Sequence, residues 1–169
     1  MKSKSNYVAR AEKFLPILMA LFAHCSTCED YEYAVKHYNA THSRPLRYSH
    51  GVSRFVIIRA DYVIKFNIDD DYWSHAGDNS SELVVYNRAK KAGYSYLLAK
   101  PTIRIIDNHV VTIMPRVNGV NNEHKNFWDY CTAEEWEWLD NNIFDLHEGN
   151  VGYYHNKPVI IDYAWDAQQ

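Results

Sequence analysis

Apolar residues recur every three or four positions in the first part of the chain, which is the spacing of one face of an α-helix. The recurring positions run from Val8 to Phe22. We expect residues 6–39 to be helical, with a second helix from Glu29 to Tyr38. The segment that ends at Pro45 should stop the helix, because the residue before a proline avoids helical backbone angles.

After Pro45 the pattern changes to short runs of β-branched and aromatic residues separated by polar turns, which predicts strands. Three hairpins are expected, joining residues 55–58 to 62–66, 102–106 to 109–114, and 151–154 to 159–161. Their turns are expected at residues 59–61, 107–108 and 156–158. These strands alternate with helices instead of forming one continuous run.

Two further helices are predicted from their start and stop signals. Ser80-Ser81 is a candidate N-cap for a helix from Glu82 to about Ala92, which Gly93 should close, and residues 67–79 before it form a polar loop. Thr132 and Glu135 have the spacing of a capping box. The order helix, strands, helix, strands, helix, hairpin predicts an α+β fold with an antiparallel sheet.

Composition narrows the class of protein. Of the 169 residues, 47 % are hydrophobic and 23 % are charged, which is typical of a single globular domain. The net charge of −3 argues against nucleic-acid binding by bulk electrostatics. The apolar run from Phe14 to Phe22 contains Pro16, lacks a clear cleavage site and is shorter than the roughly twenty residues that span a bilayer. We therefore expect a soluble cytoplasmic protein without nucleic-acid or membrane partners.

The chain has three cysteines, an odd number. Cys25 and Cys28 have the spacing of a zinc or redox pair, and His24 and His37 lie nearby in sequence. A structural zinc site normally uses four ligands from two such pairs, and here Cys131 stands alone. Ordinary cysteines in the core or on a helix surface are the favoured interpretation, with metal binding as the alternative.

The strongest chemical signal is the segment Phe144-Asp-Leu-His-Glu-Gly-Asn-Val-Gly152, which is followed by Val159-Ile-Ile-Asp-Tyr-Ala164. Asp145 and Asn150 are five residues apart, and Asp162 comes after a short predicted hairpin. An aspartate can orient an acceptor hydroxyl and take its proton, while an asparagine and a second aspartate hold magnesium against phosphates. The hairpin fixes the distances between these groups, so their spacing matters as much as their type.

These residues resemble the catalytic segment of the protein-kinase-like superfamily. The resemblance implies a catalytic base at Asp145 and magnesium ligands at Asn150 and Asp162. The form Asp-x-His-x-x-Asn is more similar to aminoglycoside phosphotransferases and small bacterial or phage kinases. Ile143-Phe144 stand where protein kinases have His-Arg, and Asp162-Tyr-Ala164 replaces Asp-Phe-Gly.

The N-terminal half resembles the same superfamily at independent positions. Lys65, in Tyr62-Val-Ile-Lys-Phe66, looks like the lysine that grips the α- and β-phosphates of ATP, and Glu82 is the candidate for its partner on the following helix. Gly51 lies where the phosphate-covering loop belongs, although that loop has only one glycine here. The backbone from Met114 to Val117 is expected to meet the adenine.

The resemblance covers about residues 47 to 166 and implies a truncated kinase-like fold. Its parts would be an N-terminal helical segment (1–46), an N-lobe-like part (47–117) and a reduced C-lobe (118–169). Only seven residues follow Asp162, so the helices that dock peptides in protein kinases should be missing. A protein substrate would then need another platform, such as a second copy of the chain in a homodimer or the N-terminal helices. By analogy with compact phage kinases, a phage origin and action in the host cytoplasm are expected.

The sequence leaves three functions open. The first is an ATP- and magnesium-dependent phosphotransferase acting on a hydroxyl of a protein or a small molecule. The second is a kinase-fold binding protein that inhibits or modulates a partner. The third is a structural role, in which the motifs coincide by chance in an aromatic-rich α+β domain. The sequence alone favours the first function, because all five chemical positions keep the required residue types.

Overall fold

The computed structural model describes residues 6–51, 53–68, 79–107, 109–119 and 127–163. Within these ranges the fold is α+β, as expected, with an antiparallel sheet in the order β1-β2-β3-β5-β4 and a separate β6-β7 hairpin. The helices are α1 (Tyr7–Leu21), α2 (Cys28–Thr41), α3 (Asn79–Ala92) and α4 (Ala133–Asn142). The strands are β1 (Arg47–His50), β2 (Arg54–Ile58), β3 (Tyr62–Asn67), β4 (Thr102–Ile106), β5 (His109–Pro115), β6 (Val151–Tyr154) and β7 (Lys157–Ile160). None of the helices in these ranges is long and apolar enough to cross a membrane.

The five-stranded sheet separates two hydrophobic cores. Side chains alternate between the two faces of a strand, so Ile64 and Phe66 point to the face opposite Lys65. On the Ile64 face, α1 and α2 cover the sheet and form the first core, which includes Phe22, Tyr31 and Phe55. The N-terminal helices therefore pack against the sheet.

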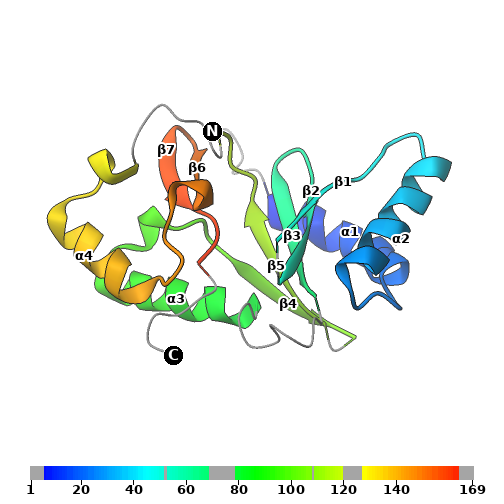
Figure 1. The fold of residues 1–169 in the computed structure, drawn as a ribbon, viewed down its shortest axis with the longest axis horizontal. Helices are drawn as coiled ribbons and strands as arrows, with labels where there is room; N and C mark the ends of the chain where they lie inside the picture. Colours follow the sequence, from blue (N-terminus) through cyan, green and yellow to red (C-terminus); the bar gives the residue numbers. More distant parts are fainter. Residues whose placement is uncertain (1–5, 52, 69–78, 108, 120–126, 164–169) are drawn as a thin grey trace.

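The second core lies beyond the opposite face of the sheet, among α3, α4 and the β6-β7 hairpin (Figure 1). Its buried residues include Val85 from α3, Leu139 from α4 and Ile160 from β7. Met114, at the end of β5, joins this core instead of the first. The polar residues of the sheet on this side consequently face α3 and the segment that follows β7.

Helix boundaries follow local capping rules, with one correction. The capping box of Thr132 and Glu135 is present at the start of α4, and Gly93 ends α3 with a left-handed φ of 88°. The helix α3 begins at Asn79, so Ser80 and Ser81 lie inside its first turn and the predicted N-cap at Ser80-Ser81 is wrong.

The sheet also differs from the prediction in two places. The strand β1 was not predicted; it pairs with β2 at the edge of the sheet, and its largely exposed, polar residues give little hydrophobic signal. The turn of the last hairpin lies at His155 and Asn156, both with positive φ, instead of at residues 156–158, because Lys157 and Pro158 already belong to β7. Two consecutive positive φ values are typical of the tight hairpin turn that matches strand twist.

A second capping box, which the sequence analysis did not predict, lies at the start of α2. It gives a testable pH dependence. Asp30 accepts hydrogen bonds from the backbone N–H groups of Thr27 and Ser26, and these bonds lower the pKa of Asp30 to about 2. Because this pKa lies below the usual value of 3.8, the stabilisation is present above pH 4 and is lost as the pH falls toward 2. We expect Asp30→Asn to lower the melting temperature at pH 7, with a difference that shrinks in acid.

Thermal melts of wild type and Asp30→Asn between pH 7 and pH 2 would measure this effect. Glu29→Gln is the matched control, because Glu29 has a similar position in the first turn but does not make the capping bonds of Asp30. A melting-temperature difference that is the same at every pH would show that the charge of Asp30 is not its source.

Candidate functional site

The candidate site lies on the face of the sheet opposite the N-terminal helices. In the register of β2 and β3, Val56 pairs with Lys65, so Arg54, two residues before Val56, shares a face with Lys65. Both cations are buried and lie against Glu82 of α3. Because side chains alternate along the strand, Ile64 and Phe66 lie in the first core and Lys65 lies in the site.

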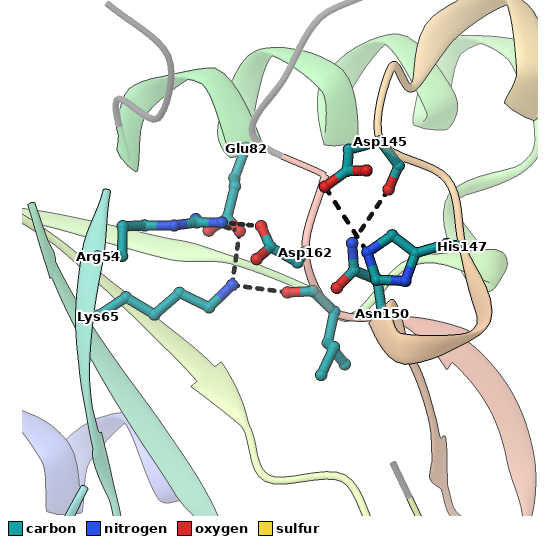
Figure 2. A network of polar contacts seen from close by, with 8 residues as sticks. Arg54, Lys65, Glu82, Asp145, His147, Asn150 and Asp162 are labelled. Atoms are coloured by element: carbon teal, nitrogen blue, oxygen red, sulfur yellow. Dashed lines mark hydrogen bonds and ion pairs between the residues drawn. The ribbon is translucent and has the colours of Figure 1, made fainter. Parts of the chain in front are cut away.

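Lys65, Arg54 and Glu82 form a buried ionic cluster (Figure 2). Glu82, on α3, is fully buried, and its Oε1 lies 2.6 Å from Lys65 Nζ and 2.6 Å from Arg54 Nη1. The ion pair expected between Lys65 and Glu82 is therefore formed. The second carboxylate oxygen, Oε2, is buried without a hydrogen-bond partner among the described residues.

The two cations control the protonation of this cluster. Burial and the neighbouring charge of Arg54 lower the pKa of Lys65 to about 8, against the opposing effect of Glu82. Burial acts to raise the pKa of Glu82, but Arg54 and Lys65 together outweigh it and hold that pKa below its usual value. Glu82 is consequently ionised at neutral pH and holds both cations on the same face.

Asp162 joins the cluster through a segment that is anchored on both sides. Arg54 makes an ion pair with Asp162, whose side chain is 47 % exposed. The preceding residue, Ile161, accepts a hydrogen bond from Lys65 Nζ at 2.6 Å through its carbonyl. The following residue, Tyr163, is buried, and its hydroxyl donates to the Ala99 carbonyl. These contacts hold the backbone of Asp162 while leaving its carboxylate accessible.

The loop from Asp145 to Asn150 approaches Asp162 from the other side (Figure 2). Asn150 donates from Nδ2 to the Asp145 carbonyl at 3.0 Å, and its own carbonyl accepts from the Ile161 N–H at 2.8 Å. Its Oδ1 is therefore the atom of this side chain that suits a metal ion. The backbone of Asn150 thus ties this loop directly to the segment that carries Asp162.

His147 shapes the same loop. Its Nδ1 accepts a hydrogen bond from the Gly149 N–H at 3.0 Å, so a neutral imidazole carries its proton on Nε2. Nε2 lies 3.7 Å from Asp145 Oδ2, and the Asp145 side chain is 68 % exposed. The Asp145 carboxylate is accordingly open to an incoming hydroxyl group, with the His147 ring beside it.

For Gly51 and Met114 the structure gives no contact that would identify a nucleotide site. Gly51 is in the turn between β1 and β2, and a Cβ added there would meet no heavy atom within 4 Å. The Met114 side chain is buried in the second core. The N–H groups of Arg116 and Asn118 donate to Asp61 and Tyr153, so an adenine would have to use other backbone groups of this segment.

Arg54 is the residue of the site that sequence reasoning missed. It is the first residue of β2, three positions after Gly51, and its side chain reaches both Glu82 and Asp162. The signal was available in strand alternation, because an arginine two residues before Val56 shares a face with Lys65 once the β2-β3 register is known. The cluster then contains two cations, Arg54 and Lys65, balanced by the carboxylates of Glu82 and Asp162.

This donor set fits magnesium and phosphate chemistry. Magnesium prefers oxygen ligands and is usually bound through one or two carboxylates together with substrate phosphates. Asp162 supplies an accessible carboxylate, and Asn150 supplies an amide oxygen on the adjoining loop. Lys65 and Arg54 supply positive charge beside them. The arrangement could therefore bind a metal–phosphate group, provided that Arg54 releases Asp162.

No protein-family model matches the chain, and no curated protein is similar to it in sequence. Its assignment to a functional class therefore rests on the residues and contacts described above.

Proposed function

We propose that the chain is a reduced protein-kinase-like phosphotransferase that uses ATP and magnesium to phosphorylate a hydroxyl of a protein or a small molecule. The observation that carries the proposal is the buried ion pair between Lys65 on the third strand and Glu82 on the next helix, with Asp162 paired to the same cluster. Protein kinases use a lysine on this strand and a glutamate on this helix in the same order.

Each residue has a role in this proposal. Lys65, oriented by Glu82, binds the α- and β-phosphates of ATP. Asn150 and Asp162 would hold magnesium, which neutralises the negative charge of the phosphates. Asp145 orients the acceptor hydroxyl and takes its proton as the γ-phosphoryl group is transferred. The contact between Asn150 and Ile161 keeps the Asp145 loop in register with Asp162.

Arg54 also supports a second candidate, a kinase-fold binding protein without transferase activity. In the structure Arg54 pairs with Asp162, the carboxylate that magnesium would need, and with Glu82, the partner of Lys65. An arginine that stays on Asp162 would keep metal out of the site. On the phosphotransferase proposal, the phosphates of ATP instead attract Arg54 away from Asp162 and free this carboxylate for the metal.

Metal-dependent nucleotide binding gives the first test. ATP should raise the melting temperature of the full chain only when magnesium is present, and Asp162→Ala should abolish this shift. Ligand linkage makes the effect measurable, since a ligand at a hundred times its dissociation constant stabilises a protein by about 2.7 kcal/mol. Differential scanning fluorimetry with ATP, with and without magnesium, would record the shift.

Asp140→Ala is the matched control, because Asp140 is an exposed aspartate on α4 outside the cluster. This variant should keep the full magnesium-dependent shift. A shift that survives in Asp162→Ala would remove Asp162 from the metal site, and the absence of any shift in wild type at millimolar ATP would favour the binding protein.

A further inference from the structure

A second cluster of metal-ligating side chains lies between α2 and the edge strand β1, outside the ionic cluster of Lys65, Glu82 and Asp162. Cys28 and Glu32 are one helical turn apart on α2, and His50 is the last residue of β1. One ligand atom from each residue lies within 4.8 Å of the others. Among the described residues, this is the one group of three cysteine, histidine or acidic side chains with such spacing.

The separation of the atoms fits tetrahedral coordination. His50 Nε2 lies 3.3 Å from Glu32 Oε1. Two ligands at the usual zinc–nitrogen and zinc–oxygen distances of 2.0–2.1 Å are about 3.3 Å apart in a tetrahedron. The Cys28 Sγ is the candidate for a third corner, because it lies within 4.8 Å of an imidazole nitrogen of His50 and a carboxylate oxygen of Glu32. The fourth corner would be taken by water.

We propose that Cys28, Glu32 and His50 bind a zinc ion or a similar borderline divalent metal. A thiolate and an imidazole select such metals over magnesium, which prefers oxygen alone. Burial, Glu32 and Glu29 raise the pKa of the Cys28 thiol, so metal binding would release a proton from it.

The positive charge of Lys36 would repel a metal ion at this site. Its Nζ lies 3.2 Å from Glu32 Oε2, the oxygen that does not face His50. The Lys36 side chain is exposed, so it can turn into solvent while Oε1 coordinates the metal. The ligand set, two potential anions and one neutral imidazole, then balances a divalent cation.

A metal at this site would fasten α2 to the edge of the sheet. The strand β1 is held on one side by β2, and its other edge has no strand partner in the five-stranded sheet. A metal coordinated by His50 on β1 and by Cys28 and Glu32 on α2 would link the strand to this helix. The site therefore predicts metal-dependent stability of the N-terminal helices, independently of any nucleotide.

Cobalt titration of the full chain in the reduced state tests this proposal. We expect one cobalt ion per chain, a near-ultraviolet thiolate-to-cobalt charge-transfer band, and displacement of cobalt by zinc. Cys28→Ser should abolish the band, and Glu32→Gln and His50→Asn should each weaken cobalt affinity at least about tenfold. Because His50 is exposed, His50→Asn keeps the test decisive even if Cys28→Ser fails to fold.

Cys25→Ser and His37→Asn are the matched controls, since both residues are close in sequence and outside the three-residue group. Both variants should bind cobalt as wild type does. The proposal is overturned if wild type shows no charge-transfer band, if the band persists in Cys28→Ser, or if Cys25→Ser loses it.

Discussion

Replacing Glu82 by leucine should lower the free energy of unfolding by about 3–5 kcal/mol, the usual effect of removing one partner from a buried ion pair. Glu82 is fully buried between Lys65 and Arg54 at 2.6 Å from each. Without it, Lys65 and Arg54 both lose this carboxylate, while Arg54 keeps its ion pair with Asp162. Because a domain is typically stable by only 5–15 kcal/mol, the variant should be much more sensitive to urea.

A double variant separates this electrostatic effect from a simple loss of packing. Adding Lys65→Met to Glu82→Leu removes one cation, which leaves Arg54 paired with Asp162. We expect the double variant to be more stable than Glu82→Leu alone in urea unfolding. Equal or additive losses would mean that the charges of Lys65 and Glu82 are not coupled.

The second large effect is expected on catalysis. Asp145→Asn should reduce phosphoryl transfer by about a hundredfold to ten-thousandfold, which is the usual contribution of a positioned general base. The carboxylate of Asp145 is exposed, and its contact with Asn150 uses the backbone carbonyl, so the substitution should leave the loop intact. Nucleotide affinity should therefore stay close to that of wild type while release or transfer of labelled γ-phosphate falls.

Asp129→Asn provides the matched control, because Asp129 is an exposed aspartate outside the loop. It should keep wild-type transfer. The same pair of variants separates the two candidate functions in cells: a binding protein would keep its full effect as Asp145→Asn, whereas a phosphotransferase would lose it. A fully potent Asp145→Asn protein would make the transferase proposal wrong.

Much of the fold could be predicted from hydrophobic periodicity. The strands around Lys65 and the capping box at Thr132 have strong local signals, and the structure has both. The strand β1 could not be found this way, since its residues lie at an exposed sheet edge where no apolar face is required. Local sequence therefore predicted the central strands better than the edge.

The residues of the candidate sites also differ in how well local sequence predicts them. The pairing of Lys65 with Glu82 followed from their order on a strand and the next helix. The role of Arg54 depends on the β2-β3 register, and the approach of His50 to Cys28 depends on β1 lying beside α2. The approach of His50 to Cys28 is a product of tertiary packing, which residue spacing along the chain does not encode, whereas Arg54 can be placed once the register of the β2-β3 hairpin is known.

The most direct test of the central claim is a crystal structure of the full chain grown with magnesium and a non-hydrolysable ATP analogue. The distances to measure are those from Lys65 Nζ to the phosphate oxygens and from the metal to Asp162 and Asn150. We predict phosphate oxygens within hydrogen-bond distance of Lys65, metal ligation by Asp162 and Asn150, and Arg54 moved from Asp162 to the phosphates. A nucleotide bound elsewhere, or an intact Arg54–Asp162 pair with no metal at Asp162 in crystals saturated with the analogue, would contradict the account.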